Sequence, residues 1–181
     1  MAKNKTSQIA LAGVMGALCL ATMFLGGILP LATFIAPALA GFFIVLVAVE
    51  TGIGTGFLLY IAVAVVSMLI VPEKEMSMVF IFFLGYYPLV KAYVDKLHPQ
   101  FLRLGAKLLI FNLCIISMYA LLLYVFPVAS LQAEFSTYAS WMAPVMLLLG
   151  NFTFLVYDQA VAKCLQVYLT RFRPRILKGR K

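Results

Sequence analysis

The chain has 181 residues, of which 65% are hydrophobic and only 11% are charged, and its formal net charge is +8. So few polar residues cannot cover a soluble domain, and the composition therefore excludes an ordinary soluble globular protein. Apolar runs of about twenty residues recur along the chain, and each can cross roughly 30 Å of hydrocarbon. We expect an all-α, polytopic membrane protein whose six transmembrane helices form one bundle.

Prolines and short polar segments divide the chain into six predicted spans. In chain order these are 8–29, 31–50, a third that follows the glycine-rich turn "TGIGTG" and ends at Pro72, a fourth from "EKEMS" to Val94, 105–126 and 143–169. The expected domain organisation is a six-helix membrane domain over residues 1–170 and a basic cytoplasmic tail over residues 171–181.

The basic residues predict which way the helices face. With the amino terminus in the cytoplasm, all lysines and arginines except Lys74 fall on the cytoplasmic side. The positive-inside rule therefore predicts cytoplasmic termini, with residues 72–76 and 128–140 outside. The excess positive charge then indicates contact with anionic lipid, or with an acidic cytoplasmic partner, and not with nucleic acid.

Cysteine and histidine give no sign of catalysis. Cys19, Cys114 and Cys164 lie in different predicted helices, with neither disulfide nor metal-ligand spacing. His98 is the only histidine, and no hydrolase, zinc or phosphate-binding motif accompanies it. We expect no enzymatic activity, no metal and no cofactor.

A set of polar residues falls within the predicted spans. At about 1.5 Å per residue, they cluster in the cytoplasmic third, apart from Asn151, which lies nearer the middle; the set is Glu50, Lys91, Asn112, Asn151 and Asp158. Buried charge in lipid is costly and is usually paired or functional. The sharper hypothesis is a Lys91–Asp158 ion pair with Asn112 or Glu50 as a further partner, and the alternative for Lys91 is snorkelling.

Pro88 follows the aromatic run "FFLGYY" in the fourth span. Proline cannot donate an amide hydrogen bond to Leu84, and Gly85 lies beside the break. This pattern predicts a kink that aromatic side chains pack.

Two ladders of small residues occupy single helix faces. The first span carries Ala10, Gly13, Ala17 and Ala21, and the second carries Ala32, Ala36 and Ala40. Such ladders let another helix approach closely. One ladder is expected to pack within the bundle, and the sequence does not say which ladder faces outward.

These features together resemble one family. The size, the six spans, the "ALCLA" segment, the proline-broken "GGILPLATFIAPALAG" and the "ETGIGTG" segment are similar to the substrate-capture subunit (S component) of energy-coupling factor (ECF) transporters of the bacterial cell membrane. The resemblance implies that Ala17 and Ala21 contact the coupling subunit, which carries two ATPases, and that substrate binds near the outer face. Candidate substrate residues are then Glu134, Tyr138 and Trp141, and the apolar outer half implies a fairly hydrophobic ligand.

A second class stays open. The cell-shape protein family MreD has a similar size and helix count, and it has a non-transporting, scaffold-like role. Its acidic residue after a proline early in the second helix has no counterpart here. An S-component-like scaffold or assembly protein of the cell envelope is therefore the alternative.

Overall fold

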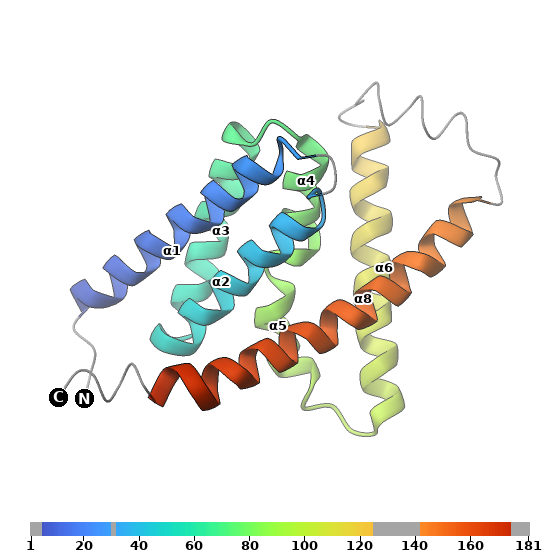
Figure 1. The fold of residues 1–181 in the computed structure, drawn as a ribbon. Helices are drawn as coiled ribbons and strands as arrows, with labels where there is room; N and C mark the ends of the chain where they lie inside the picture. Colours follow the sequence, from blue (N-terminus) through green and yellow to red (C-terminus); the bar gives the residue numbers. More distant parts are fainter. Residues whose placement is uncertain (1–4, 30–31, 125–141, 175–181) are drawn as a thin grey trace. The chain divides into compact units, whose positions relative to one another are not determined.

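The computed structural model describes residues 5–29, 32–124 and 142–174, and their regular structure is helical (Figure 1). The elements are α1 (Lys5–Gly26), α2 (Ile35–Thr51), α3 (Ile53–Ile70), α4 (Lys74–Val79), the π-helix η1 (Phe80–Leu84), α5 (Tyr87–Val94), α6 (Gln100–Tyr124), α8 (Met142–Val167) and the π-helix η2 (Tyr168–Phe172). Since α4, η1 and α5 form one broken helix, and η2 continues α8, the described residues contain the six expected helices.

Five of these helices are long and apolar enough to span a membrane. The spans are Lys5–Gly26, Ile53–Ile70, Lys74–Val94, Gln100–Leu122 and Pro144–Arg171. The chain is therefore a multi-pass membrane protein by helix length and hydropathy. The remaining helix, α2, has 17 residues, which corresponds to about 25 Å.

The chain divides into two compact units, which are described separately below. Unit 1 covers residues 1–135 and holds α1 to α6, and unit 2 covers residues 136–181 and holds α8 and η2. The predicted boundary at residue 170 stays a prediction.

Helix α2 is the centre of unit 1, where it contacts α1, α3, η1 and α5. Small residues allow these close contacts. A Cβ on Gly56 of α3 would lie 2.6 Å from the Cβ of Ala48, and the thiol of Cys19 donates to the carbonyl oxygen of Ala40 over 3.4 Å. Ala36 and Ala40 are buried, so the small-residue ladder of the second span is used in packing within unit 1.

The glycine-rich turn between α2 and α3 is shorter than predicted. Gly52 alone has a positive φ, of 107°, and α3 begins at the next residue. Gly54 and Gly56 lie inside α3. One glycine suffices because a positive φ is needed at a single position of the turn.

The helix after Pro99 also begins earlier than predicted. We expected it from about residue 105, but α6 begins at Gln100. The amides of Leu102 and Arg103 both bond to the Pro99 carbonyl, at 3.1 and 3.2 Å. These bonds start the helix directly after the proline, and residues 100–103 form its first turn.

The predicted break before Pro88 is confirmed. Residues Phe80–Leu84 form a π-turn, and the amide of Gly85 bonds to the carbonyl of Phe80, five residues back, at 2.8 Å. The Ile81 carbonyl accepts a hydrogen bond from the hydroxyl of Tyr60 on α3.

Aromatic rings pack around this break, as expected. The ring centroids of Phe83 and Tyr87 lie 4.8 Å apart, and those of Phe83 and Phe111 lie 5.2 Å apart. Tyr60 packs against Phe80 and Tyr86 with centroids 5.9 and 5.8 Å away. The break is therefore a fixed part of the core and not a loose joint.

Candidate functional site

The two faces of α1 differ in their environment. Its buried residues are Gly16, Cys19, Met23 and Gly26. The ladder on the opposite side is exposed, and it consists of Ala10, Gly13, Ala17 and Ala21. A Cβ on Gly13 would meet nothing within 4 Å. The ladder that the sequence left open is thus the outward one, while its contact with a partner stays a prediction.

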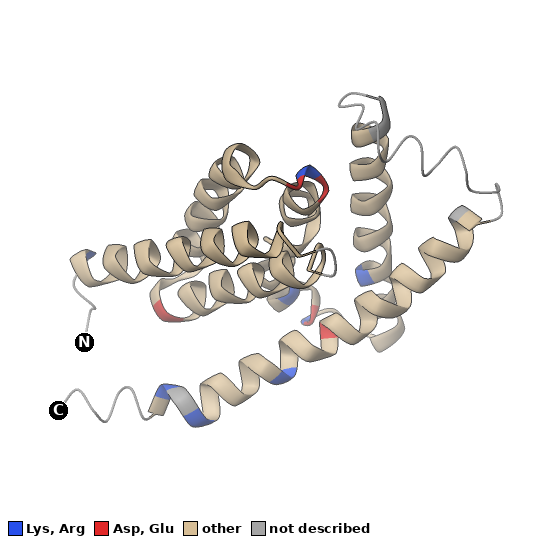
Figure 2. Ribbon diagram, turned by 45° about the horizontal axis from the view of Figure 1, so that its top comes forward, with Lys and Arg blue, Asp and Glu red and all other residues tan. Residues whose placement is uncertain are grey.

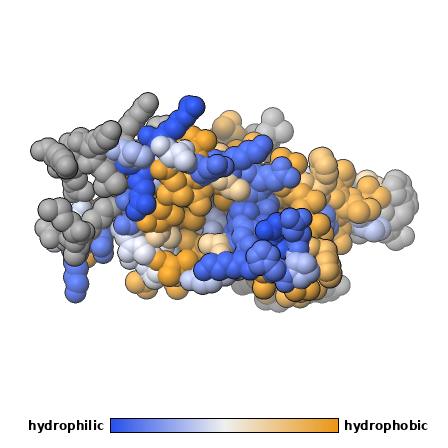
Figure 3. Space-filling model, turned by 90° about the horizontal axis from the view of Figure 1, so that it is seen from below, coloured by the Kyte–Doolittle hydropathy of each residue, from blue (hydrophilic) through white to orange (hydrophobic). Residues whose placement is uncertain are grey.

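A charged cluster joins α5 to α6. The Nζ atom of Lys91 lies 3.3 Å from Oδ2 of Asp95, and Nζ of Lys107 contacts Oδ1 of the same carboxylate. Both lysines are buried, with 7% and 5% of their surfaces exposed. Buried charges require partners, and here one carboxylate serves two helices. Charged residues of unit 1 lie mostly near helix ends in Figure 2. In Figure 3, hydrophilic side chains (blue) are interspersed with large hydrophobic areas (orange).

Sequence reasoning missed Asp95 and assigned Lys107 only to topology. The predicted fourth span ended at Val94, as α5 does, and Asp95 directly follows that residue. Its spacing of four residues from Lys91 was the available signal, because residues at i and i+4 face each other on a helix. Lys91 reaches toward the end of α5, as snorkelling also predicts, but its ammonium group meets a carboxylate.

The predicted polar set is divided between the two units. Glu50, Lys91 and Asn112 belong to unit 1, and Asn151 and Asp158 belong to unit 2. The Lys91–Asp158 pair therefore stays a prediction.

The two asparagines of this set bond to their own helices. Asn112 donates to the Leu108 carbonyl and Asn151 donates to the Leu147 carbonyl, each over 2.8 Å. At least one amide hydrogen of each asparagine is thus satisfied within its own helix, and each of these bonds spans one helical turn.

Charged residues at the start of α4 contact other parts of unit 1. Thr33 donates to Oε1 of Glu73 over 2.8 Å, and Tyr119 of α6 donates to Oε1 of Glu75 over 2.7 Å. Lys74 donates to the carbonyl oxygens at the end of α3, from Met68 and Val71. These contacts tie the α1–α2 connection, α3 and α6 to α4. The predicted substrate residues Glu134, Tyr138 and Trp141 lie outside the described residues.

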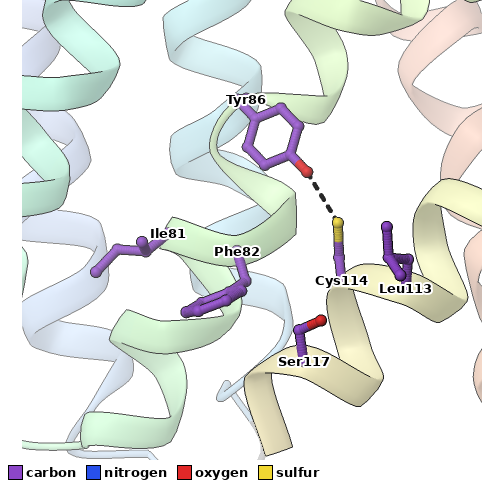
Figure 4. A pocket seen from close by; sticks show the side chains of 6 residues that line it. All are labelled: Ile81, Phe82, Tyr86, Leu113, Cys114 and Ser117. Atoms are coloured by element: carbon purple, nitrogen blue, oxygen red, sulfur yellow. Dashed lines mark hydrogen bonds between the residues drawn. The ribbon is translucent and has the colours of Figure 1, made fainter. Parts of the chain in front are cut away.

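An open groove of about 310 Å³ lies between the η1 region and α6 (Figure 4). Its lining residues are Ile81, Phe82, Tyr86, Leu113, Cys114 and Ser117. The hydroxyl of Tyr86 and the thiol of Cys114 form a 2.9 Å hydrogen bond at its edge. The sequence interpretation treated Cys114 as apolar filler and did not predict this groove. The only available signal was the polar pair Cys114 and Ser117, one turn apart on an apolar helix.

Comparisons with protein-family models, with curated proteins and with solved structures found no match to the chain. Over residues 5–29, 32–124 and 142–174, no three histidine, cysteine or acidic side chains come together as a metal site would require. The case for a function therefore depends on the membrane fold and on the surfaces described above.

Proposed function

We propose that this chain is the membrane-embedded substrate-binding subunit of an ECF-type importer for a small, fairly hydrophobic micronutrient. It resides in the bacterial cell membrane with both termini in the cytoplasm, and its role is binding and not catalysis. The observation that carries the proposal is the exposed ladder on α1. The ladder of α2 is used inside unit 1, whereas Gly13, Ala17 and Ala21 remain on the surface.

The ladder suits contact with a second membrane protein. Helices in lipid gain little from hydrophobic burial, and they associate mainly where small residues let their backbones approach. Large exposed residues flank the ladder, among them Val14 at 62% and Leu18 at 45% exposed. Gly13, Ala17 and Ala21 form the floor of a shallow channel between these larger side chains. A helix of the coupling subunit would pack into this channel.

The polar contacts at the start of α4 support a hydrophobic ligand over a charged one. Glu73, Lys74 and Glu75 were the main charged residues of the predicted outer end, and each contacts another part of unit 1. A strongly charged substrate would have to compete with these contacts. An apolar ligand would not.

The same contacts favour the second candidate, a non-transporting S-component-like scaffold of the cell envelope. Charged residues that link helices to one another are as consistent with a scaffold role as with a substrate-binding role. Such a scaffold would also dock through the exposed face of α1, and the basic residues after α8 would contact anionic lipid. The two candidates differ in their partners and not in the surface that they use.

Purification of the tagged chain from its native membrane in mild detergent, followed by mass spectrometry, tests the proposal. Recovery of a transmembrane coupling subunit with a pair of ATPases is the expected result. Recovery of cell-wall or division proteins without ATPases would establish the scaffold instead. Recovery of neither class, from membranes that contain both, would overturn the proposal.

A further inference from the structure

The groove of unit 1 is formed where the helix is irregular. Ile81 and Phe82 belong to the π-turn, and Tyr86 lies just after it, while the opposite wall comes from α6. π-Turns are rare and occur frequently at functional sites, because the extra residue changes where the side chains point. The irregular backbone therefore supplies a wall that a regular helix would not.

Contacts behind this wall fix its shape. Tyr60 donates its hydroxyl hydrogen to the Ile81 carbonyl. A Cβ on Gly85 would lie 2.8 Å from both the Phe80 carbonyl oxygen and the ring of Tyr60, so the backbone is closely packed from behind. A preformed wall favours binding because less conformational entropy is lost when a ligand binds.

The groove lies at the depth of the hydrocarbon. Ile81 and Tyr86 fall in the central part of the Lys74–Val94 span. Leu113 lies near the middle of the Gln100–Leu122 span, and Ser117 lies one turn nearer its end, still inside the span. Leu113 is 65% exposed, so the groove wall reaches the surface of unit 1. A ligand at this depth has to be soluble in the membrane.

The Tyr86–Cys114 hydrogen bond gives the groove its polar specificity. A thiol is a weak hydrogen-bond partner, whereas a tyrosine hydroxyl is a strong one. An oxygen atom of a ligand would therefore replace the Cys114 sulfur favourably. Ser117, one turn further along α6 on the same wall, offers a second hydroxyl group.

We propose that this groove binds a membrane-dissolved amphiphile with one hydroxyl or carbonyl group on an apolar chain or ring. The apolar part lies against Ile81, Phe82 and Leu113, and the ligand oxygen takes the place of Cys114 as the partner of Tyr86. A volume of about 310 Å³ is at the lower end of the range for small-molecule sites. The inference rests on the proposed function for its biological meaning, since the amphiphile would be the imported ligand.

Photolabelling of the full chain in lipid nanodiscs tests this site. The probes are a long-chain fatty alcohol that carries a diazirine and the matched alkane with the same diazirine. The alcohol should label the groove residues about two- to tenfold more than the alkane, which is the range expected for one net hydrogen bond. Equal labelling by both probes would mean that the groove holds bulk lipid only, and it would overturn the proposal.

Three variants sharpen the test. Tyr86→Phe should abolish the preference for the alcohol, and Cys114→Val should increase alcohol labelling because it removes the internal competitor for Tyr86. Ile116→Phe is the control, since Ile116 is 57% exposed on α6 and does not line the groove. A decrease with Cys114→Val in protein that still elutes as a monodisperse species would contradict the proposal. Partner recovery is measured separately, so failure of the groove is distinguishable from failure of the importer role.

Discussion

Lys107 on α6 contacts the carboxylate of Asp95, which also lies 3.3 Å from the ammonium group of Lys91. This shared carboxylate links the end of α5 to the second turn of α6. The negative charge of Asp95 lies at one end of the Lys74–Val94 span, and it reduces the repulsion between the ammonium groups of the two lysines. The stability of this end of unit 1 should therefore depend on Asp95.

Asp95→Asn should lower the stability of the protein. The substitution leaves two buried lysines beside a neutral amide, and the loss should be roughly 1–3 kcal/mol. Thermal unfolding in detergent measures it, with exposed Lys96→Gln as the control. Adding Lys107→Met to Asp95→Asn should recover part of the loss, and a double variant less stable than Asp95→Asn would contradict the interpretation.

Gly41→Ala should disturb the break in the fourth helix. A Cβ on Gly41 would overlap the carbonyl oxygen of Leu84, which Pro88 cannot bond. Because the obstacle is backbone, we expect a loss of roughly 1–3 kcal/mol in detergent unfolding. Gly54→Ala is the matched control, since its Cβ would meet nothing within 4 Å, and it should be neutral or slightly stabilising. Equal effects of the two substitutions would show that the close approach of α2 to the Leu84 carbonyl does not contribute to stability.

The Lys91–Asp158 pair remains a prediction of the sequence. Asp158 is too short to reach water easily from within its span, and a lone buried charge is worse than none. Lys91→Met and Asp158→Leu should each destabilise the protein, and the double variant should recover about 1 kcal/mol or more. Strictly additive losses in a double-mutant cycle would show that the two side chains do not interact.

The topology is also testable at single positions. We expect a cysteine placed at position 74, in a cysteine-free background, to react with a membrane-impermeant maleimide added outside intact cells. A cysteine at position 96 should react only after the cells are opened, because the positive-inside rule places it in the cytoplasm. The reverse labelling pattern would show that the protein has the opposite orientation in the membrane, with both termini outside the cytoplasm.

The sequence predicted the elements of this fold better than their contacts. Apolar run length and the prolines were enough for six helices, and Pro88 with Gly85 was enough for the break at Phe80–Leu84. These features are local. The extent of the turn at Gly52 was overestimated because a glycine in a turn and a glycine at a helix contact, such as Gly56, look the same in one sequence.

Contacts between helices were harder to predict. The two ladders have equivalent patterns, and only packing shows that Cys19 and not Ala17 faces α2. Lys107 was missed as a partner of Asp95 because the contact depends on how α6 turns after Pro99. The groove beside Cys114 depends on a π-turn, and hydrophobic periodicity does not predict π-turns.

The central claim is that the exposed ladder of α1 docks on a membrane partner, and a quantitative pull-down tests it most directly. Tagged wild-type chain, Ala17→Leu and Ala21→Leu would be purified from native membranes. Leu58→Phe is the control for added volume, since Leu58 is 70% exposed and lies on α3, outside the ladder. We predict that both ladder variants express and elute as the wild type does but lose about tenfold or more of the coupling subunit and its ATPases, because added volume separates helices that touch through small residues. Full retention of these partners by well-folded Ala17→Leu and Ala21→Leu would contradict the account.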